Sequence, residues 1–352
     1  MNAEKPEYLK LYLSLRDQIV QGAWGYGDRL PSRRQIARDR GKSVITVEHS
    51  YELLCQEGYI EARPRSGYYV IYKTSDGFAQ SSAEQPIFQR YAAVSRENTI
   101  PFSVLAKTMR RVLTEYGEAI LNKSPNAGCP ELRNALSRYL ARNRGIHAAP
   151  GQIVIGSGAE YLYGLVVELL GRNRLFAIES PSYEKIEQVY RAKGVACDPL
   201  PLGQDGIESA ALSGTDASVL HITPYRSFPS GVTASASKRL EYIRWAQYQQ
   251  NRFIVEDDFE SEFSLLRKPE ETVFSRSGQV IYLNTFSRTV SPSIRVGYMV
   301  LPTQLVPEFQ QKLGFYSCTV PAFEQYVLSS LINNGDFERH INRMRRIARK
   351  AK

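Results

Sequence analysis

VIYLNTFSRTVSPSIRVGYMVLP, residues 280–302, is the stretch around which the rest of the chain is best interpreted. Two short apolar runs of β-strand type, residues 280–283 and 296–300, flank a polar loop. The loop carries serines and two arginines: Ser287, Arg288, Ser291, Ser293 and Arg295. Guanidinium and hydroxyl groups donate hydrogen bonds to anions, so the loop suits an anionic ligand. Taken alone, it is equally consistent with an ordinary basic loop between two strands.

The composition predicts a soluble, cytoplasmic protein of two or three domains. The chain has 352 residues, 43% of them hydrophobic, which is enough for sizeable cores. No apolar run approaches the roughly 20 residues of a membrane span, and the N-terminus lacks a signal-peptide pattern. Cys55, Cys129, Cys197 and Cys318 have no metal-ligand spacing, so no metal site or disulfide framework is expected. The net charge of +9 favours a polyanionic partner.

Residues 1–73 follow the pattern of a winged helix-turn-helix. Apolar residues at helical spacing predict a first helix near residues 8–21. Ser32 and Ser43 are good N-cap residues for a short second helix and a longer third helix. Residues 59–71 then predict a β-hairpin with two arginines at its tip. A helix, a helix-turn-helix and a hairpin in this order make a winged helix.

The remainder of the chain predicts an α/β domain. Residues 74–86 are small and polar and predict a flexible linker. Beyond residue 87, short apolar runs alternate with helical segments, which indicates a mostly parallel sheet with helices on both faces. The predicted strands include 153–155, 175–178, 218–222 and 253–255, and the predicted helices include 102–121, 161–170 and 235–250. Ligands of such sheets bind at the carboxyl ends of the strands.

Residues suited to ligand binding follow three of these strands. Gly156-Ser157-Gly158-Ala159 leads into a helix, so its N–H groups and the helix N-terminus can hold a phosphate. The same four residues are also typical of a plain tight turn. Tyr183 follows the second strand, and the carboxylates of residues 256–258 follow the strand at 253–255.

These motifs resemble one family in both halves of the chain. LPSRRQIA (30–37), KSVITVEHSYELLCQEGYI (42–60) and ARPRSGYYV (62–70) resemble the GntR-type DNA-binding domain in order and spacing. The 280–302 stretch, the 223–231 loop and the 128–133 segment resemble the fold-type I aminotransferase-like domain of MocR-type GntR regulators. The resemblance implies a winged helix at 1–73, a linker at 74–86 and an aminotransferase-like domain at 87–352.

For the first domain the resemblance implies binding to a double-stranded DNA operator. The arginines that begin the second helix would lie near phosphates, the start of the third helix would enter the major groove, and the hairpin would form the wing. The implied contacts are Arg33, Arg34, Lys42, Ser43, Thr46, Arg63, Arg65 and Gly67. Val44 stands where the family usually has arginine, so the operator sequence of other family members cannot be assigned to this chain.

For the second domain the resemblance implies pyridoxal 5'-phosphate (PLP) as cofactor. The implied binding residues are Ser157, Gly158, Ala159, Tyr183, Asp257, Phe259, Ser287, Arg288 and Arg295. Tyr183 would stack on the pyridine ring and Asp257 would pair with its nitrogen. Arg288 replaces the Schiff-base lysine of the family, and Phe259 replaces a tyrosine. A guanidinium stays protonated at physiological pH and cannot form that bond.

We therefore expect a transcriptional regulator whose aminotransferase-like domain forms a homodimer and senses a small-molecule effector. PLP bound without a covalent bond is a candidate effector. An active aminotransferase with a DNA-binding appendage and a ligand-free dimerisation scaffold are the alternatives. Arg288, Phe259 and the expected absence of the family's C-terminal small domain count against an enzyme. The retained Ser157, Tyr183 and Asp257 favour a ligand.

Overall fold

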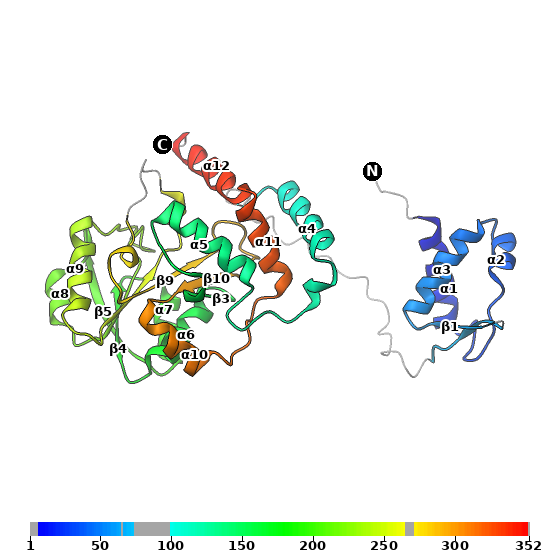
Figure 1. Cartoon of the computed structure of the whole chain (residues 1–352), viewed down its shortest axis with the longest axis horizontal. Coiled ribbons are helices and arrows are strands. Elements are labelled where there is room, and N and C mark those ends of the chain that lie inside the picture. The colour runs from blue at the N-terminus through cyan, green and yellow to red at the C-terminus, as the bar shows by residue number, and fades with distance from the viewer. Residues whose placement is uncertain (1–5, 65, 74–98, 265–270, 351–352) are drawn as a thin grey trace. The chain divides into compact units, whose positions relative to one another are not determined.

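The computed structural model describes residues 6–64, 66–73, 99–264 and 271–350. The chain divides into two compact units, residues 1–92 and 93–352 (Figure 1). The linker predicted at residues 74–86 and the wing residue Arg65 lie outside the described residues. Among the helices of the described ranges, none combines the length and the apolar character that crossing a bilayer requires.

The small unit consists of three helices and a hairpin. They are α1 (Glu7–Val20), α2 (Arg33–Asp39), α3 (Val44–Gln56), β1 (Ile60–Arg63) and β2 (Gly67–Val70). Both predicted N-caps form: the Ser32 hydroxyl accepts the Gln35 N–H at 3.3 Å, and the Ser43 hydroxyl accepts the Thr46 N–H at 3.1 Å. The two strands pair antiparallel. This order of elements is the predicted winged helix-turn-helix.

An eight-stranded sheet forms the centre of the described part of the large unit. Its strands are β3 (Ile153–Gly156), β4 (Leu175–Ser180), β5 (Ala196–Gly203), β6 (Gly206–Ile207), β7 (Val219–Ile222), β8 (Phe253–Asp257), β9 (Val280–Thr285) and β10 (Gly297–Val300). Their spatial order is β3-β10-β9-β8-β7-β4-β5-β6. The pairs from β5 through β4, β7 and β8 to β9 are parallel. β10 is antiparallel to both β3 and β9, so β3 runs in the direction of β9.

Helices cover both faces of this sheet, as predicted (Figure 1). They are α4 (Phe102–Tyr116), α5 (Pro130–Arg144), α6 (Ala159–Leu170), α7 (Glu184–Ala192), α8 (Ser209–Gly214), α9 (Ala236–Gln247), α10 (Val306–Leu313), α11 (Ala322–Asn333) and α12 (Asp336–Lys350). Short 3-10 helices lie at Gly117–Leu121, Pro150–Gln152, Ser261–Phe263, Phe274–Arg276 and Thr303–Leu305. Alternate strand residues enter opposite layers: Val154 packs with α6, α7 and α10, whereas Ile153 and Ile155 pack with α5 and α11. This alternation follows from the two-residue period of a strand.

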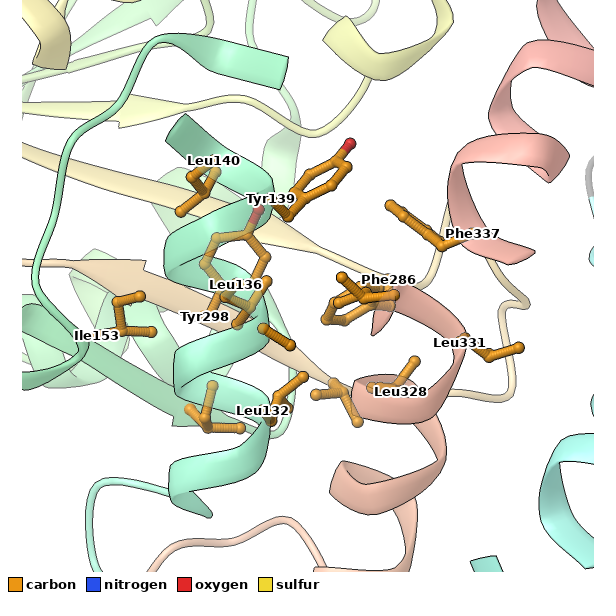
Figure 2. Close-up of a cluster of buried hydrophobic side chains, with 14 of the residues drawn as sticks. Leu132, Leu136, Tyr139, Leu140, Ile153, Phe286, Tyr298, Leu328, Leu331 and Phe337 are labelled. Atoms are coloured by element: carbon orange, nitrogen blue, oxygen red, sulfur yellow. The ribbon is translucent and has the colours of Figure 1, made fainter. Parts of the chain in front are cut away.

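Figure 2 shows the cluster that joins α5 and α11 to the sheet, with Phe286 lying between the two helices. Phe286 directly follows β9 and is 2% exposed. Its ring meets that of Phe337 edge to face, with centroids 5.7 Å apart. Burial of this ring therefore anchors the chain immediately before Ser287 and Arg288.

One predicted helix is shorter than expected. The sequence predicts a continuous helix over residues 102–121, but α4 ends at Tyr116 and a 3-10 helix follows. Gly117 has a φ of +50°, a left-handed conformation that glycine adopts readily and that ends an α-helix.

Candidate ligand cavity and nucleic-acid interface

The sheet topology brings the predicted ligand residues to one edge. β3, β4, β7, β8 and β9 run in the same direction, so their carboxyl ends meet there. Gly158 follows β3, Tyr183 follows β4, Asp257 ends β8 and Arg288 follows β9. β10 runs in the opposite direction, which places Arg295, shortly before its start, at the same edge.

A cavity of about 380 Å³ opens at this edge. Seven of the nine predicted ligand residues line it: Ala159, Tyr183, Asp257, Phe259, Ser287, Arg288 and Arg295. The other lining residues are Glu160, Tyr163, Ile186, Thr223, Phe228, Glu260 and Thr285. Ser157 and Gly158 are not part of the lining, although Gly158 lies next to Arg295. The volume lies within the roughly 300–1,000 Å³ typical of small-molecule sites.

Asp257 lines this cavity, and one of its carboxylate oxygens has no hydrogen-bond partner in the described chain. The side chain is 3% exposed, and its Oδ2 accepts a hydrogen bond from the Tyr163 hydroxyl. The Nε2 of His221 lies 3.8 Å from the same Oδ2. Asp257 Oδ1 is buried and has no hydrogen-bond partner among the described residues. A buried, unpaired carboxylate oxygen is costly, so this atom suits a donor supplied by a ligand.

Tyr163 keeps its proton in this arrangement. Burial raises the pKa of its hydroxyl well above the usual value, and the negative charge of Asp257 raises that pKa further. The phenol therefore remains a hydrogen-bond donor throughout the physiological pH range. It fixes the orientation of the carboxylate and leaves Oδ1 for the cavity.

The start of α6 forms the phosphate-binding candidate. Gly158 is the N-cap, with a φ of +100°, and a Cβ placed there would lie 3.2 Å from Nη2 of Arg295. Only glycine fits this backbone and this neighbour without strain. Arg295 Nη2 also lies 3.3 Å from Oε2 of Glu160, in the first turn of the helix. A guanidinium beside the free N–H groups of a helix N-terminus suits a phosphate.

Two aromatic rings lie at the exposed side of the cavity. Tyr183 is 38% exposed and Phe228 is 58% exposed. Their ring centroids are 6.2 Å apart at an interplanar angle of 74°. The exposed part of Tyr183 is compatible with stacking on a ligand ring, which is the role implied by the family resemblance.

Arg288 makes an ion pair inside the protein. Its Nη2 donates to Oε1 of Glu260, whose side chain is only 12% exposed. Arg226, from the loop after β7, places its Nη1 3.6 Å from Oε2 of the same carboxylate. The backbone of Arg226 has a φ of +50°, which is uncommon outside glycine. Glu260 thus lies between two guanidiniums at the cavity.

Lys185 pairs with a carboxylate that lines the cavity. Its Nζ lies 2.7 Å from Oε1 of the cavity residue Glu160. That hydrogen bond raises the pKa of the Lys185 amine, and the charge of the carboxylate adds to the effect. Lys185 is not among the residues that line the cavity, and no lysine of the described chain is.

Several cavity residues were not predicted from the sequence. They are Glu160, Tyr163, Thr223, Phe228, Glu260 and Thr285, together with His221 behind Asp257. Tyr163 had a usable signal, because it lies four residues after Ala159 in a predicted helix and therefore on the same face. Glu260 had none, because its partners are Arg226 and Arg288, distant in sequence.

The implied DNA contacts of the small unit divide into paired and unpaired groups. Arg33 pairs with Glu48 of α3, and Lys42 pairs with Glu7 of α1. Arg34 has no ion pair among the described residues. It lines an open groove together with Ala37, Arg38, Lys42, Ser43 and Val44. Arg38 was not predicted, but it lies four residues after Arg34 and shares its helix face.

The start of α3 and the hairpin carry side chains of different chemical types. The hydroxyls of Ser43 and Thr46 lie 2.8 Å apart and hydrogen-bond to each other. Val44 is 45% exposed and Ile45 66% exposed, so the first turn of α3 presents apolar groups. Arg63 lies over the Tyr69 ring at 4.4 Å.

Gly67 opens the second strand of the wing. It has a φ of +117°, and a Cβ there would lie 3.1 Å from Nε of Arg29. Arg29 therefore lies alongside the wing, in a position that the sequence motifs did not indicate.

Comparison with known proteins covers both units. Residues 7–70 match the family of bacterial regulatory proteins, gntR family, and residues 95–352 match aminotransferase class I and II. The uncharacterized HTH-type transcriptional regulator YdeL of Bacillus subtilis is 31% identical over 98% of this chain and 77% of its own length. The "Probable rhizopine catabolism regulatory protein MocR" of Rhizobium meliloti is 28% identical over 98% of this chain and 76% of its own.

A solved structure gives the same fold for the large unit. LysN, the alpha-aminoadipate aminotransferase of Thermus thermophilus, is 25% identical with a TM-score of 0.62. The match covers 71% of this chain and 65% of the LysN chain. That structure holds N-(5'-phosphopyridoxyl)-L-leucine.

Proposed function

This chain belongs to the MocR-type transcriptional regulators, which join a gntR-family helix-turn-helix to an aminotransferase class I and II domain, and we propose that its large unit senses a PLP-like ligand. The ligand is held without a covalent bond to the protein. Its binding changes the affinity of the small unit for DNA. The chain acts as a homodimer, so that two winged helices contact two half-sites of an operator.

The unpaired Oδ1 of Asp257 is the observation that carries this proposal. It is a buried acceptor beside a cavity of cofactor size, and the protonated nitrogen of a pyridine ring would satisfy it. The N–H groups at the start of α6 and Arg295 would hold the phosphate. Tyr183 would pack against the ring. PLP supplies an electron sink when bound, and these residues would position its ring.

Arg288 separates this function from transamination. A transaminase needs an amine that forms an imine with the cofactor and moves a proton at the substrate carbon. The guanidinium of Arg288 does neither at neutral pH, and it is paired with Glu260. Lys185 is ion-paired with Glu160, and no lysine of the described chain lines the cavity. An active aminotransferase is therefore the less favoured function for this chain.

In the small unit, the groove along α2 and the start of α3 would lie against the DNA backbone. Arg34 and Arg38 provide its phosphate contacts, and Ser43 and Thr46 begin the helix that enters the major groove. The exposed Val44 would contact an apolar group such as a thymine methyl.

The test joins the two units. Duplexes selected from a randomised pool by the full chain are titrated with protein, with and without pyridoxamine 5'-phosphate. We expect the ligand to change the dissociation constant for the selected duplex, and Asp257→Asn to require about tenfold more ligand, or a higher excess, for the same change. DNA affinity that is identical with and without saturating ligand would contradict a sensing role.

A further inference from the structure

Glu260 is bound at both oxygens by guanidiniums from different parts of the large unit. Arg288 comes from the loop after β9 and contacts Oε1, while Arg226 comes from the loop after β7 and approaches Oε2. The side chains of Arg288 and Arg226 are 54% and 59% exposed, whereas that of Glu260 is 12% exposed. The carboxylate thus lies in a site formed by two arginines that remain open to solvent.

This arrangement has the form of a carboxylate-binding subsite. Arginine guanidiniums bind carboxylates through charge-assisted hydrogen bonds and are favoured where such groups are recognised. Glu260 and Arg288 line the same cavity as Asp257 and Arg295, and Arg226 reaches the cavity through Glu260. A ligand held by its phosphate near Arg295 would therefore extend toward a second pair of guanidiniums. The acid now bound there belongs to the chain itself.

We propose that Arg226 and Arg288 form a carboxylate subsite that Glu260 occupies in the absence of ligand. The inference rests on the proposed phosphate-binding function of the cavity and names its ligand class. The ligand carries a phosphate at one end and a carboxylate at the other, as in a phosphopyridoxyl group joined to an amino acid. Its carboxylate displaces Glu260 from the two arginines.

Glu260 acts in this account as an internal competitor. A ligand carboxylate can bind the two guanidiniums only after Glu260 has released them. The measured affinity for the ligand is therefore lower than the intrinsic affinity of the subsite. Removing the charge of Glu260 leaves both arginines open to an external anion. The same substitution leaves the affinity for a ligand without a carboxylate unchanged.

The experiment uses two secondary amines that differ by one carboxylate. N-(5'-phosphopyridoxyl)glycine carries the carboxylate, and N-(5'-phosphopyridoxyl)methylamine lacks it. Their dissociation constants are measured by calorimetry on the full chain, and the ratio between them reports the subsite. Neither probe reacts with the protein, so the readout is binding alone.

We expect wild type to prefer the glycine adduct, and Glu260→Gln to increase that preference on the order of tenfold. Arg226→Asn combined with Arg288→Gln should make the two constants equal, and asparagine tolerates the left-handed backbone at position 226. Arg191→Gln is the matched control, because it removes an arginine–glutamate pair on α7 outside the cavity lining. The control should leave the ratio unchanged.

The outcomes separate this inference from the proposed function. Equal constants for the two adducts in both wild type and Glu260→Gln would overturn the carboxylate subsite while leaving the phosphate site standing. Failure of both adducts to bind would overturn the proposed ligand cavity and the subsite with it. A preference that survives the double arginine variant would place the carboxylate elsewhere.

Discussion

Tyr163 donates a hydrogen bond to Oδ2 of Asp257, while the buried Oδ1 of the same carboxylate has no hydrogen-bond partner in the described chain. The relationship links α6 to the end of β8, two elements far apart in the sequence. A carboxylate fixed on one side and open on the other is prepared for a ligand donor. Ligand binding in the proposed regulation depends on this open acceptor.

Asp257→Asn should lower the affinity for pyridoxamine 5'-phosphate by about tenfold or more, because a charge-assisted hydrogen bond to a buried carboxylate is replaced by a neutral one. Tyr163→Phe should have a smaller effect, since the carboxylate remains but loses its orientation. Calorimetric titration of both variants with the ligand tests whether Asp257→Asn loses more affinity than Tyr163→Phe. Equal affinity of Asp257→Asn and wild type would contradict the assigned role of Oδ1.

Gly158→Ala should weaken binding of the same ligand through the phosphate end. The added methyl group would lie 3.2 Å from Nη2 of Arg295 in a left-handed backbone that alanine avoids. Gly171→Ala is the control, because Gly171 has a nearly identical φ of +99° at the other end of α6 and nothing within 4 Å. The control shares the backbone strain, so both variants should lose thermal stability. Only Gly158→Ala should lose ligand affinity.

Stability of the large unit should fall as pH rises from about 5 to about 7.5. Burial raises the pKa of the Glu179, Glu256 and Glu262 carboxyls to about 7 from an ordinary value of 4.5. Between those values the folded state retains protons that the unfolded state has released, so the free energy of unfolding decreases with pH and the loss is complete above about pH 7. Since one pKa unit corresponds to about 1.4 kcal/mol, each carboxyl lowers the free energy of unfolding over this range by about 1–3 kcal/mol.

Glu262→Gln should make that pH dependence shallower. Burial and the nearby charge of Asp258 raise the pKa of Glu262, and glutamine keeps an acceptor for the Asn284 amide. Urea unfolding at pH 5 and pH 7.5 provides the measurement. A Trp24→Phe background leaves Trp245 of the large unit as the fluorescent reporter. An unchanged difference between the two pH values would mean that Glu262 does not titrate in this window.

In the small unit, replacing Arg34 and Arg38 with alanine should reduce the salt dependence of DNA binding. Each lost phosphate contact lowers the slope of log affinity against log salt by about 0.9 per winged helix. Arg16→Ala serves as the control, because Arg16 pairs with Asp17 on α1 outside the groove. If the double variant retained the wild-type slope, the groove along α2 would not face the phosphates.

Local rules predicted much of this fold. The caps at Ser32 and Ser43 depend on residues three positions away, and both formed as expected. The strands that supply the cavity were visible as apolar runs, and ligands of such sheets bind at the carboxyl ends of strands. Seven of the residues implied by the family resemblance line one cavity at those ends.

Interactions between distant segments were not predictable in the same way. The position of β10 between β3 and β9 cannot be derived from the letters of Gly297–Val300. Arg33 pairs with Glu48 of another helix, and no spacing in the sequence indicates that pair. The bridging of Glu260 by Arg226 and Arg288 joins three loops, and no spacing in the sequence signals it.

The most direct test is a spectroscopic titration of the full chain with PLP, alongside Arg288→Lys. Wild type should bind PLP reversibly, with the spectrum of the free aldehyde and no adduct retained after borohydride reduction and dialysis. Arg288→Lys should gain the visible absorbance of a lysine imine and retain the label at position 288, because the cavity, Asp257 and the phosphate end are already in place. A borohydride-stable PLP label on Lys185 or any other lysine of wild type would contradict non-covalent binding, and failure of both proteins to bind PLP would contradict the ligand cavity itself.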